Sequence, residues 1–316
     1  MSKTLAVVGA TGKQGGALIN YILNDPELSK QYTIRAIARD VDSEKSKDLK
    51  ARGIQVVRGD LADQASMKKA LTGAQYFFFV TTPSWTATDL KPEYEIIKKT
   101  ADTAVEAGIE YIIFSSLPST SDISGGKYTA NHPFDAKAEG EKYIRTLPIK
   151  KAFVRLAFFL ENITQIPLWQ PQKDTEGNWV MSLQLSSKTR LPWIDNGSNI
   201  GSFVGAILAE PDKYDGVGFD AAVGHYSMEE LVAIESKATG KDITYKQISP
   251  EEFAEKLPIM KEVYVNAFHA GEEFGYFGAE GEKSVAWAAE RARGKLVTPE
   301  EYFKANPLVL DERIGS

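Results

Sequence analysis

A short stretch near the start of the chain constrains the fold more than any other. Leu5–Val8 predicts a buried strand, and Ala17–Leu23 predicts a helix with its apolar face on a sheet. Between them stand three glycines spaced G-x-x-G-x-x-G, namely Gly9, Gly12 and Gly15. A helix N-terminus after a glycine turn attracts anions, because its backbone N–H groups point outward and its dipole favours negative charge. An ordinary surface turn is the alternative, but the flanking strand and helix favour a phosphate-binding turn.

The first half of the chain alternates apolar strands with amphipathic helices. Predicted strands cover residues 33–38, 54–57, 76–80, 111–114 and 151–155, and predicted helices cover residues 64–71, 91–107 and 136–147. This alternation indicates a doubly wound parallel sheet, an α/β fold of the Rossmann type. From residue 158 onward the alternation fails. We therefore divide the chain into a Rossmann domain, 1–157, and a smaller C-terminal α/β domain, 158–316, for a substrate or partner, with segments around 190–222 returning to the sheet.

The residues after each strand matter most, because ligands of such sheets bind at the carboxyl ends of the strands. Arg39 and Asp40 follow the second strand. An acid there accepts the ribose 2′-hydroxyl of NAD, whereas an arginine pairs with the 2′-phosphate of NADP. Arg39 comes first, and a guanidinium can hold a phosphate through two hydrogen bonds. We therefore predict that NADP(H) is the cofactor, with a solvated surface arginine as the alternative.

Three further strand ends carry residues of interest. Asp60 could accept the adenine amino group while Leu61 covers the ring, although a turn or helix N-cap aspartate explains Asp60 equally well. After the fourth strand, the small residues 81–83 leave room for the middle of the cofactor. After the fifth, Ser115 stands where a reductase would place an active-site hydroxyl.

The composition excludes several kinds of site. The chain of 316 residues has a net charge of −6 and no block of Lys and Arg, so we expect no direct nucleic-acid binding. It has no cysteine, which excludes disulfides and thiolate catalysis. Its three histidines lack metal-ligand spacing, so we expect no metal. Its apolar runs are too short for a membrane span or a signal peptide. We expect a monomer or homodimer in the cytoplasm, with the nucleus to be considered as an additional location.

Several segments together resemble the NmrA-like family, a branch of the atypical short-chain dehydrogenases. The matching segments are residues 9–15, 59–61, 134–137, 159–162 and 191–195, so the resemblance covers nearly the whole chain. The glycine motif that carries Gln14 is fairly specific to this branch. The resemblance implies an NADP-preferring Rossmann domain with a smaller C-terminal domain. Some members are NADP sensors that bind partner proteins, including fungal transcription factors, and others are reductases.

The resemblance also implies roles for individual residues. Thr11, Gly12 and Gln14 would meet the pyrophosphate, and Arg39 the 2′-phosphate. Other matching positions would meet the nicotinamide ribose, namely Thr81 and Lys137, and the nicotinamide end, namely Phe159 and Asn162. The complete predicted cofactor-binding set is Gly9, Thr11, Gly12, Lys13, Gln14, Gly15, Arg39, Asp60, Leu61, Thr81, Thr82, Pro83, Lys137, Phe159 and Asn162.

The predicted chemistry depends on Lys137. Short-chain reductases usually place a tyrosine four residues before the lysine, so that both side chains share one helix face and the ammonium lowers the pKa of the phenol. Here Pro133 occupies that position, and the Tyr-x-x-x-Lys pair is missing. Tyr128 and His132 are the other candidate proton donors, but neither has the helical register. An exposed loop tyrosine and a helix-start histidine are the alternative interpretations.

Two functions from different classes are consistent with this sequence. The first is a redox-sensing regulator that reports the NADP state to a protein partner, which the missing tyrosine favours. The second is an NADPH-dependent reductase of a small carbonyl, imine or quinone-like substrate, which the cofactor motif and Lys137 favour. The sequence names neither the partner nor the substrate, and it leaves open whether the protein is an enzyme.

Overall fold

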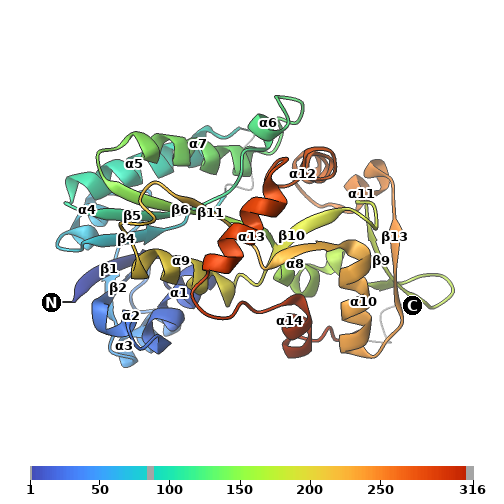
Figure 1. The fold of residues 1–316 in the computed structure, drawn as a ribbon, viewed down its shortest axis with the longest axis horizontal. Coiled ribbons are helices and arrows are strands. Elements are labelled where there is room, and N and C mark those ends of the chain that lie inside the picture. The colour runs from blue at the N-terminus through green and yellow to red at the C-terminus, as the bar shows by residue number, and fades with distance from the viewer. Residues whose placement is uncertain (1, 84–88, 311–316) are drawn as a thin grey trace.

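A computed structural model describes residues 2–83 and 89–310 (Figure 1). Its centre is a seven-stranded sheet with the order β11-β6-β5-β4-β1-β2-β3, and every neighbouring pair is parallel. The strands of this sheet are β1 (Lys3–Val8), β2 (Tyr32–Ala38), β3 (Gln55–Arg58), β4 (Tyr76–Phe79), β5 (Tyr111–Ser116), β6 (Lys150–Leu156) and β11 (Gly218–Ala221). The predicted Rossmann-type doubly wound sheet is confirmed.

Helices cover both faces of this sheet (Figure 1). On one face lie α4 (Gln64–Leu71), α5 (Lys91–Glu106) and α7 (His132–Thr146). On the other lie α1 (Lys13–Asn24), α2 (Leu28–Gln31), α3 (Glu44–Ala51) and α9 (Asn199–Ala209). The central strand β4 is buried at all four positions, as expected for a strand that is covered on both faces. The short α6 (Thr120–Ile123) follows β5.

Some predicted boundaries differ from the structure at helix starts. Helix α7 begins at His132 rather than Ala136, because Pro133 lies in the first turn. Backbone N–H groups in the first turn have no partner within the helix, so a proline there costs no hydrogen bond. Helix α1 begins at Lys13 rather than Ala17, with Gly15 and Gly16 inside its first turns. Helix α3 and the two-residue extension of β5 to Ser116 have no counterpart in the sequence prediction.

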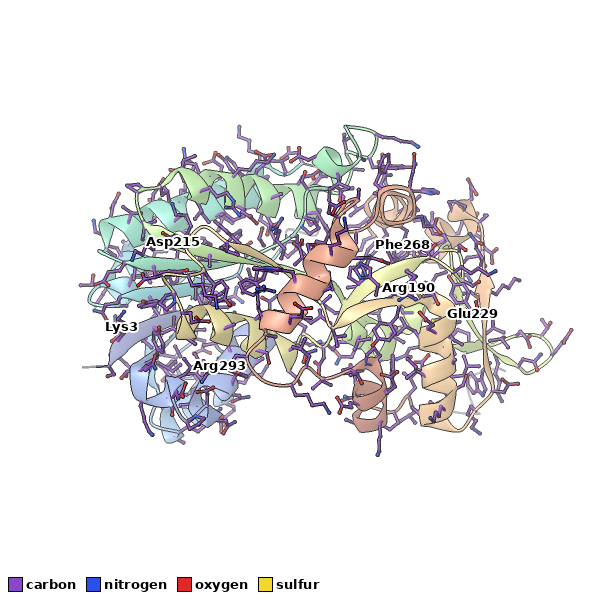
Figure 2. All side chains as sticks on the ribbon, viewed as in Figure 1. Lys3, Arg190, Asp215, Glu229, Phe268 and Arg293 are labelled. Atoms are coloured by element: carbon purple, nitrogen blue, oxygen red, sulfur yellow. The ribbon has the colours of Figure 1, made fainter. Side chains whose placement is uncertain are left out.

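The second half contains two further sheets of three strands. One has the order β12-β10-β7 and the other β13-β9-β8. Their strands are β7 (Phe158–Phe159), β8 (Gln172–Lys173), β9 (Trp179–Leu183), β10 (Arg190–Ile194), β12 (Gly224–Ser227) and β13 (Ile243–Gln247). The helices are α8 (Leu160–Gln165), the 3-10 turn η1 (Pro167–Trp169), α10 (Met228–Thr239), α11 (Pro250–Lys256), α12 (Lys261–Phe274), α13 (Gly281–Arg291) and α14 (Pro299–Ala305). Trp169, Trp193 and Phe268, the last labelled in Figure 2, are buried together in their core.

The two halves of the chain are interlocked. Helix α9 packs on α1, β11 completes the central sheet beside β6, and α13 crosses in front of β11 (Figure 1). After α13, Arg293 (Figure 2) reaches back to the turn between α1 and α2. Its guanidinium lies 2.6 Å from Asp25 Oδ2 and 2.7 Å from Glu27 Oε2, and it lowers the pKa of Asp25 to about 2. The first and second halves are therefore held together by both packing and charge.

Candidate functional site

A cavity of about 520 Å³ lies at the carboxyl ends of β1 to β4. Its walls come from the glycine turn and from the segments after β2, β3 and β4. The predicted cofactor residues in its lining are Gly9, Thr11, Gly12, Lys13, Gln14, Gly15, Arg39, Asp60, Leu61, Thr81, Thr82 and Pro83. Twelve of the fifteen predicted residues therefore meet in one place, and Lys137, Phe159 and Asn162 do not line it.

The glycine turn has the geometry of an anion site. Gly9 has φ +72°, a conformation that other residues rarely adopt, and its carbonyl accepts the N–H of Gly12 at 2.8 Å. Gly12 is the N-cap of α1, and no side chain caps this helix end. A Cβ on Gly15 would lie only 2.5 Å from the carbonyl carbon of Gly9, so only glycine allows this approach of helix and turn. The first N–H groups of α1 are left to face the cavity.

Two basic side chains mark the end of the cavity near β2. Arg39 is exposed, and among the described residues its guanidinium has no hydrogen-bond or ion-pair partner. Lys45 in α3 donates a hydrogen bond to the carbonyl of Thr11 at 3.1 Å. This edge therefore has positive charge available for a phosphate beyond the one at the helix N-terminus.

Asp60 serves as a turn aspartate and also lines the cavity. Its Oδ1 accepts the N–H of Ala62 at 3.0 Å, while the N-cap of α4 is Asp63. Leu61 is half-buried beside it in the lining. The turn interpretation of Asp60 therefore holds, and the predicted adenine contact stays a prediction.

Behind the cavity wall, Lys137 is committed to an ion pair. Its ammonium contacts Glu93 Oε1, and the hydroxyl of Thr81 donates to the same oxygen at 2.6 Å. Lys137 and Glu93 are each 5% exposed and Thr81 is 4% exposed. Burial lowers the pKa of Lys137, and the Glu93 carboxylate opposes that shift. Nothing in the sequence alone marks Glu93, because its contact with Lys137 depends on the packing of α5 against α7.

A second buried carboxylate supports the loop after β10. Glu161 in α8 accepts the N–H groups of Asn196 at 3.2 Å and Gly197 at 3.0 Å, and burial raises its pKa. Asn196 lines the cavity. Nearby, Lys13 Nζ donates to Gln165 Oε1 at 2.5 Å, which joins the start of α1 to the end of α8. Asn196 is not among the predicted site residues, and the only sequence signals near it are the segments 159–162 and 191–195.

The remaining predicted residues lie away from the cavity lining. The hydroxyl of Tyr128 donates to Glu273 Oε2 at 2.9 Å, and its ring stacks on His269 with centroids 6.0 Å apart. His132 is the first residue of α7. Phe159 is half-buried at the start of α8, and Asn162 lies one turn further along. Their predicted roles at the nicotinamide end, or as proton donors, stay predictions.

A second cavity, of about 770 Å³, lies in the C-terminal half. Its walls are largely apolar and aromatic, and they include Ile166, Leu168, Trp169, Leu257, Ile259 and Tyr264. It shares no lining residue with the first cavity. Met260, just beyond this wall, has φ +54° and is the one non-glycine residue with positive φ among the described residues.

Neither a metal site nor a membrane-spanning helix is found among the described residues. No group of three His, Asp or Glu side chains there could hold a metal ion. None of the helices in that part of the chain has both the length and the apolar character that a membrane crossing requires.

The chain is similar to known proteins over most of its length. An NmrA-like family domain-containing protein of Dictyostelium discoideum is 28% identical, covering 98% of this chain and 100% of its own. The NmrA-like oxidoreductase cpsB of Aspergillus campestris is 29% identical, covering 88% and 86%. The solved structure of NmrA, a negative transcriptional regulator, in complex with NADP is 25% identical with a TM-score of 0.78, covering 96% and 94%. NmrA has also been solved in complex with NAD.

The family assignment rests on nearly the full length of the chain. The model of the NmrA-like family matches residues 1–303, which include the glycine turn, both cavities and every residue of the Thr81–Glu93–Lys137 cluster. The chain belongs to the NmrA-like family.

Proposed function

We propose that this protein binds NADP(H) in the first cavity and acts as a redox-sensing regulator through a protein partner. The glycine turn supplies helix N–H groups for the pyrophosphate, and Arg39 and Lys45 supply positive charge at the β2 edge for a 2′-phosphate. The N-terminus of α1 is open to a phosphate, because its N-cap is a glycine and no side chain caps it. The similarity to NmrA, which binds NADP, supports the same assignment.

One observation favours sensing over turnover: the ammonium of Lys137 is paired with Glu93 inside the protein. NADPH, when bound, supplies a hydride, and a carbonyl that accepts it needs a proton from a group within hydrogen-bond reach. Among the described residues, the lining of the cavity includes neither tyrosine nor histidine. Thr81, whose hydrogen is donated to Glu93, can orient a bound molecule but has no spare proton to give.

Two measurements on the purified protein test this proposal. Calorimetry should show that NADP⁺ and NADPH bind with different affinities, both more tightly than NAD⁺. NADPH consumption should stay below about 1 s⁻¹, the low end of ordinary enzymes, across a panel of aldehydes, ketones, quinones and imines. Faster turnover with any member of the panel would reject the sensor assignment, and equal affinity for NADP⁺ and NADPH would leave no redox state to sense.

A reductase is the second candidate, and the C-terminal cavity favours it. Its volume lies in the range of small-molecule sites, and Trp169 and Tyr264 give it aromatic walls suited to a flat quinone or imine. Relatives of this chain are named oxidoreductases. If turnover is found, Tyr128→Phe, His132→Ala and Lys137→Ala identify the proton donor, because only loss of that donor should cost about 10²–10⁴-fold in rate.

A further inference from the structure

The buried carboxylate of Glu93 contacts two predicted cofactor-binding residues at once. It accepts the hydrogen of Thr81 and pairs with the ammonium of Lys137, although the three residues come from the end of β4, from α5 and from α7. We propose that Glu93 is the positioning residue of the nicotinamide-ribose subsite: it keeps Thr81 as a hydrogen-bond acceptor at the cavity wall and keeps Lys137 charged behind it. The inference rests on the proposed NADP(H) site.

The packing of two helices makes this contact possible. Glu93 lies in the first turn of α5 and Lys137 near the start of α7, and the two helices run side by side (Figure 1). One turn further along each helix, Gly140 faces Ile97, and a Cβ on Gly140 would lie 2.5 Å from Ile97 Cγ2. Because only glycine permits this approach, Gly140 brings the helix starts close enough for the buried ion pair.

The position of the Thr81 hydrogen determines what the wall offers a ligand. A hydroxyl has one hydrogen and two lone pairs, and here the hydrogen is directed at Glu93 Oε1 at 2.6 Å. Thr81 therefore presents only acceptor capacity to the cavity it lines. An ammonium has three hydrogens and no acceptor, so Lys137 keeps donors beyond the one used by Glu93. Thr81 is the member of this cluster that lines the cavity, so it can accept a hydrogen bond from a ribose hydroxyl, while the charge of Lys137 acts on the subsite from behind the wall.

Glu93 is also the counterion that keeps Lys137 charged. Burial disfavours an isolated ammonium, and a neighbouring carboxylate offsets that penalty. Three charged groups on elements packed against α7 are engaged elsewhere: Asp102 of α5 accepts from Tyr143, Asp122 of α6 pairs with Lys142, and Arg155 of β6 pairs with Asp220. Among the described residues, Glu93 is the carboxylate that contacts Lys137 and opposes the effect of burial on its pKa.

The test is a set of NADP⁺ affinities measured by calorimetry between pH 6.5 and 9. The wild type should show little change across this range, because the ion pair keeps Lys137 protonated. Glu93→Gln should bind at least 10-fold more weakly at pH 9 than at pH 6.5, because its buried lysine loses the proton. Lys137→Met should be weak and independent of pH. The double variant should match Lys137→Met, because a glutamine oxygen can still accept the hydrogen of Thr81 and the remaining effect of Glu93 acts through that lysine.

Two further variants separate positioning from folding. Glu141→Gln is the matched control, because Glu141, like Glu93, is a buried carboxylate that pairs with a basic side chain. It lies on α7, is 5% exposed and pairs with Arg145, and it does not line the cavity. It should keep wild-type affinity at every pH. Glu93→Asp retains the charge and should therefore show the same flat pH profile as the wild type. A melting curve shows whether Glu93→Gln is folded, and Glu93→Asp carries the test if it is not.

The outcomes distinguish this inference from the proposed function. Wild-type affinity and a flat profile in Glu93→Gln would overturn the role of Glu93 and leave the NADP(H) site intact. Additive losses in the double variant would do the same, because they would show that the two residues act separately. Absence of NADP⁺ binding by the folded wild type would overturn the proposed function, and this inference with it.

Discussion

The hydroxyl of Ser115, at the end of β5, donates a hydrogen bond to the side-chain oxygen of Gln14 at 2.7 Å. Ser115 is 2% exposed, and Gln14 lies in the first turn of α1 and lines the cavity. The serine stands where a reductase would have an active-site hydroxyl, but its hydrogen is already used to hold Gln14. This hydrogen bond fixes the side chain of Gln14 beside the glycine turn, which agrees with the proposal of a binding site without a built-in proton donor.

Arg39→Ala should remove most of the preference for NADP(H) over NAD(H). A hydrogen bond to a charged group contributes about 1.5–3 kcal/mol, so NADP⁺ affinity should fall about 10- to 100-fold while NAD⁺ affinity stays unchanged. Calorimetry with both cofactors measures the ratio. Arg52→Ala is the charge-matched control, since Arg52 pairs with Asp48 at the end of α3 and does not line the cavity. Equal binding of both cofactors by the wild type would contradict the role of Arg39.

The three glycines at the start of α1 should respond differently to substitution. Gly12→Val should leave the protein folded but block cofactor binding, because Gly12 is exposed and its side chain would occupy the phosphate site. Gly15→Ala should lower the melting temperature, because its Cβ would meet the backbone of Gly9. Gly16→Ala is the control: its Cβ would lie 3.5 Å from Ala10 O, an ordinary contact.

Gly16→Ala should stabilise the helix by up to about 1 kcal/mol, since alanine is the better helix former. Thermal melting and NADP⁺ calorimetry on the same three variants check all of these expectations. Unchanged cofactor affinity in folded Gly12→Val would mean that the phosphates bind elsewhere.

Glu235 should make the protein less stable as the pH rises. This carboxyl in α10 is 1% exposed, neither oxygen has a hydrogen-bond partner, and burial raises its pKa from 4.5 to about 8. Between these values the folded state holds a proton that the unfolded state has released, so the free energy of unfolding falls with rising pH. The loss is up to about 5 kcal/mol by pH 8, at about 1.4 kcal/mol per pH unit.

Glu235→Gln should remove this pH dependence, so its free energy of unfolding should exceed that of the wild type by more at pH 8 than at pH 5. Urea unfolding of both proteins at the two pH values measures this difference. Glu229→Gln on the same helix is the control, because Glu229 (Figure 2) is exposed and should change stability by less than about 1 kcal/mol. A wild type whose stability is the same at pH 5 and pH 8 would refute the raised pKa.

The contact of α9 with α1 should tolerate no added methyl group. A Cβ on Gly205 would lie 2.5 Å from Tyr21 Cε1, and one on Gly201 would lie 2.7 Å from Tyr21 Cγ. Gly205→Ala should therefore cost about 1–3 kcal/mol by overpacking. Combining it with Tyr21→Ala should cost less than the two losses added, because removing the ring frees the space. Additive losses in urea unfolding would show that ring and glycine do not compete.

Local patterns predicted the elements that depend on neighbouring residues in sequence. Helix α4 spans residues 64–71 as predicted, and in the structure Ser227 and Thr298 each form a capping box with the glutamate three residues later. A capping box is a contact across three residues, so its signal is complete in the sequence. The strand-glycine-helix order at Gly9 is local in the same way, and the glycine turn that it predicts lines the first cavity.

Contacts between distant elements could not be predicted in this way. Glu93 appears in the sequence as an ordinary acid in a helix first turn, and only the packing of α5 on α7 brings it to Lys137, 44 residues away. The strand β7 has two residues and therefore no periodicity to detect. Tyr128 and His132 are candidate proton donors because they lie near Lys137 in sequence, yet neither lines the cavity.

The late position of α9 and β11 in the chain has a consequence for synthesis on the ribosome. β6 ends at Leu156, but the strand that pairs with its outer edge ends at Ala221, 65 residues later. At about 5–20 residues per second, the interval between them is about 3–13 s. During that time the nascent chain has an open sheet edge and an uncovered face on α1, the features through which unfinished chains associate. The nascent chain is therefore most exposed to association with other chains until Ala221 has left the exit tunnel and β11 can pair with β6.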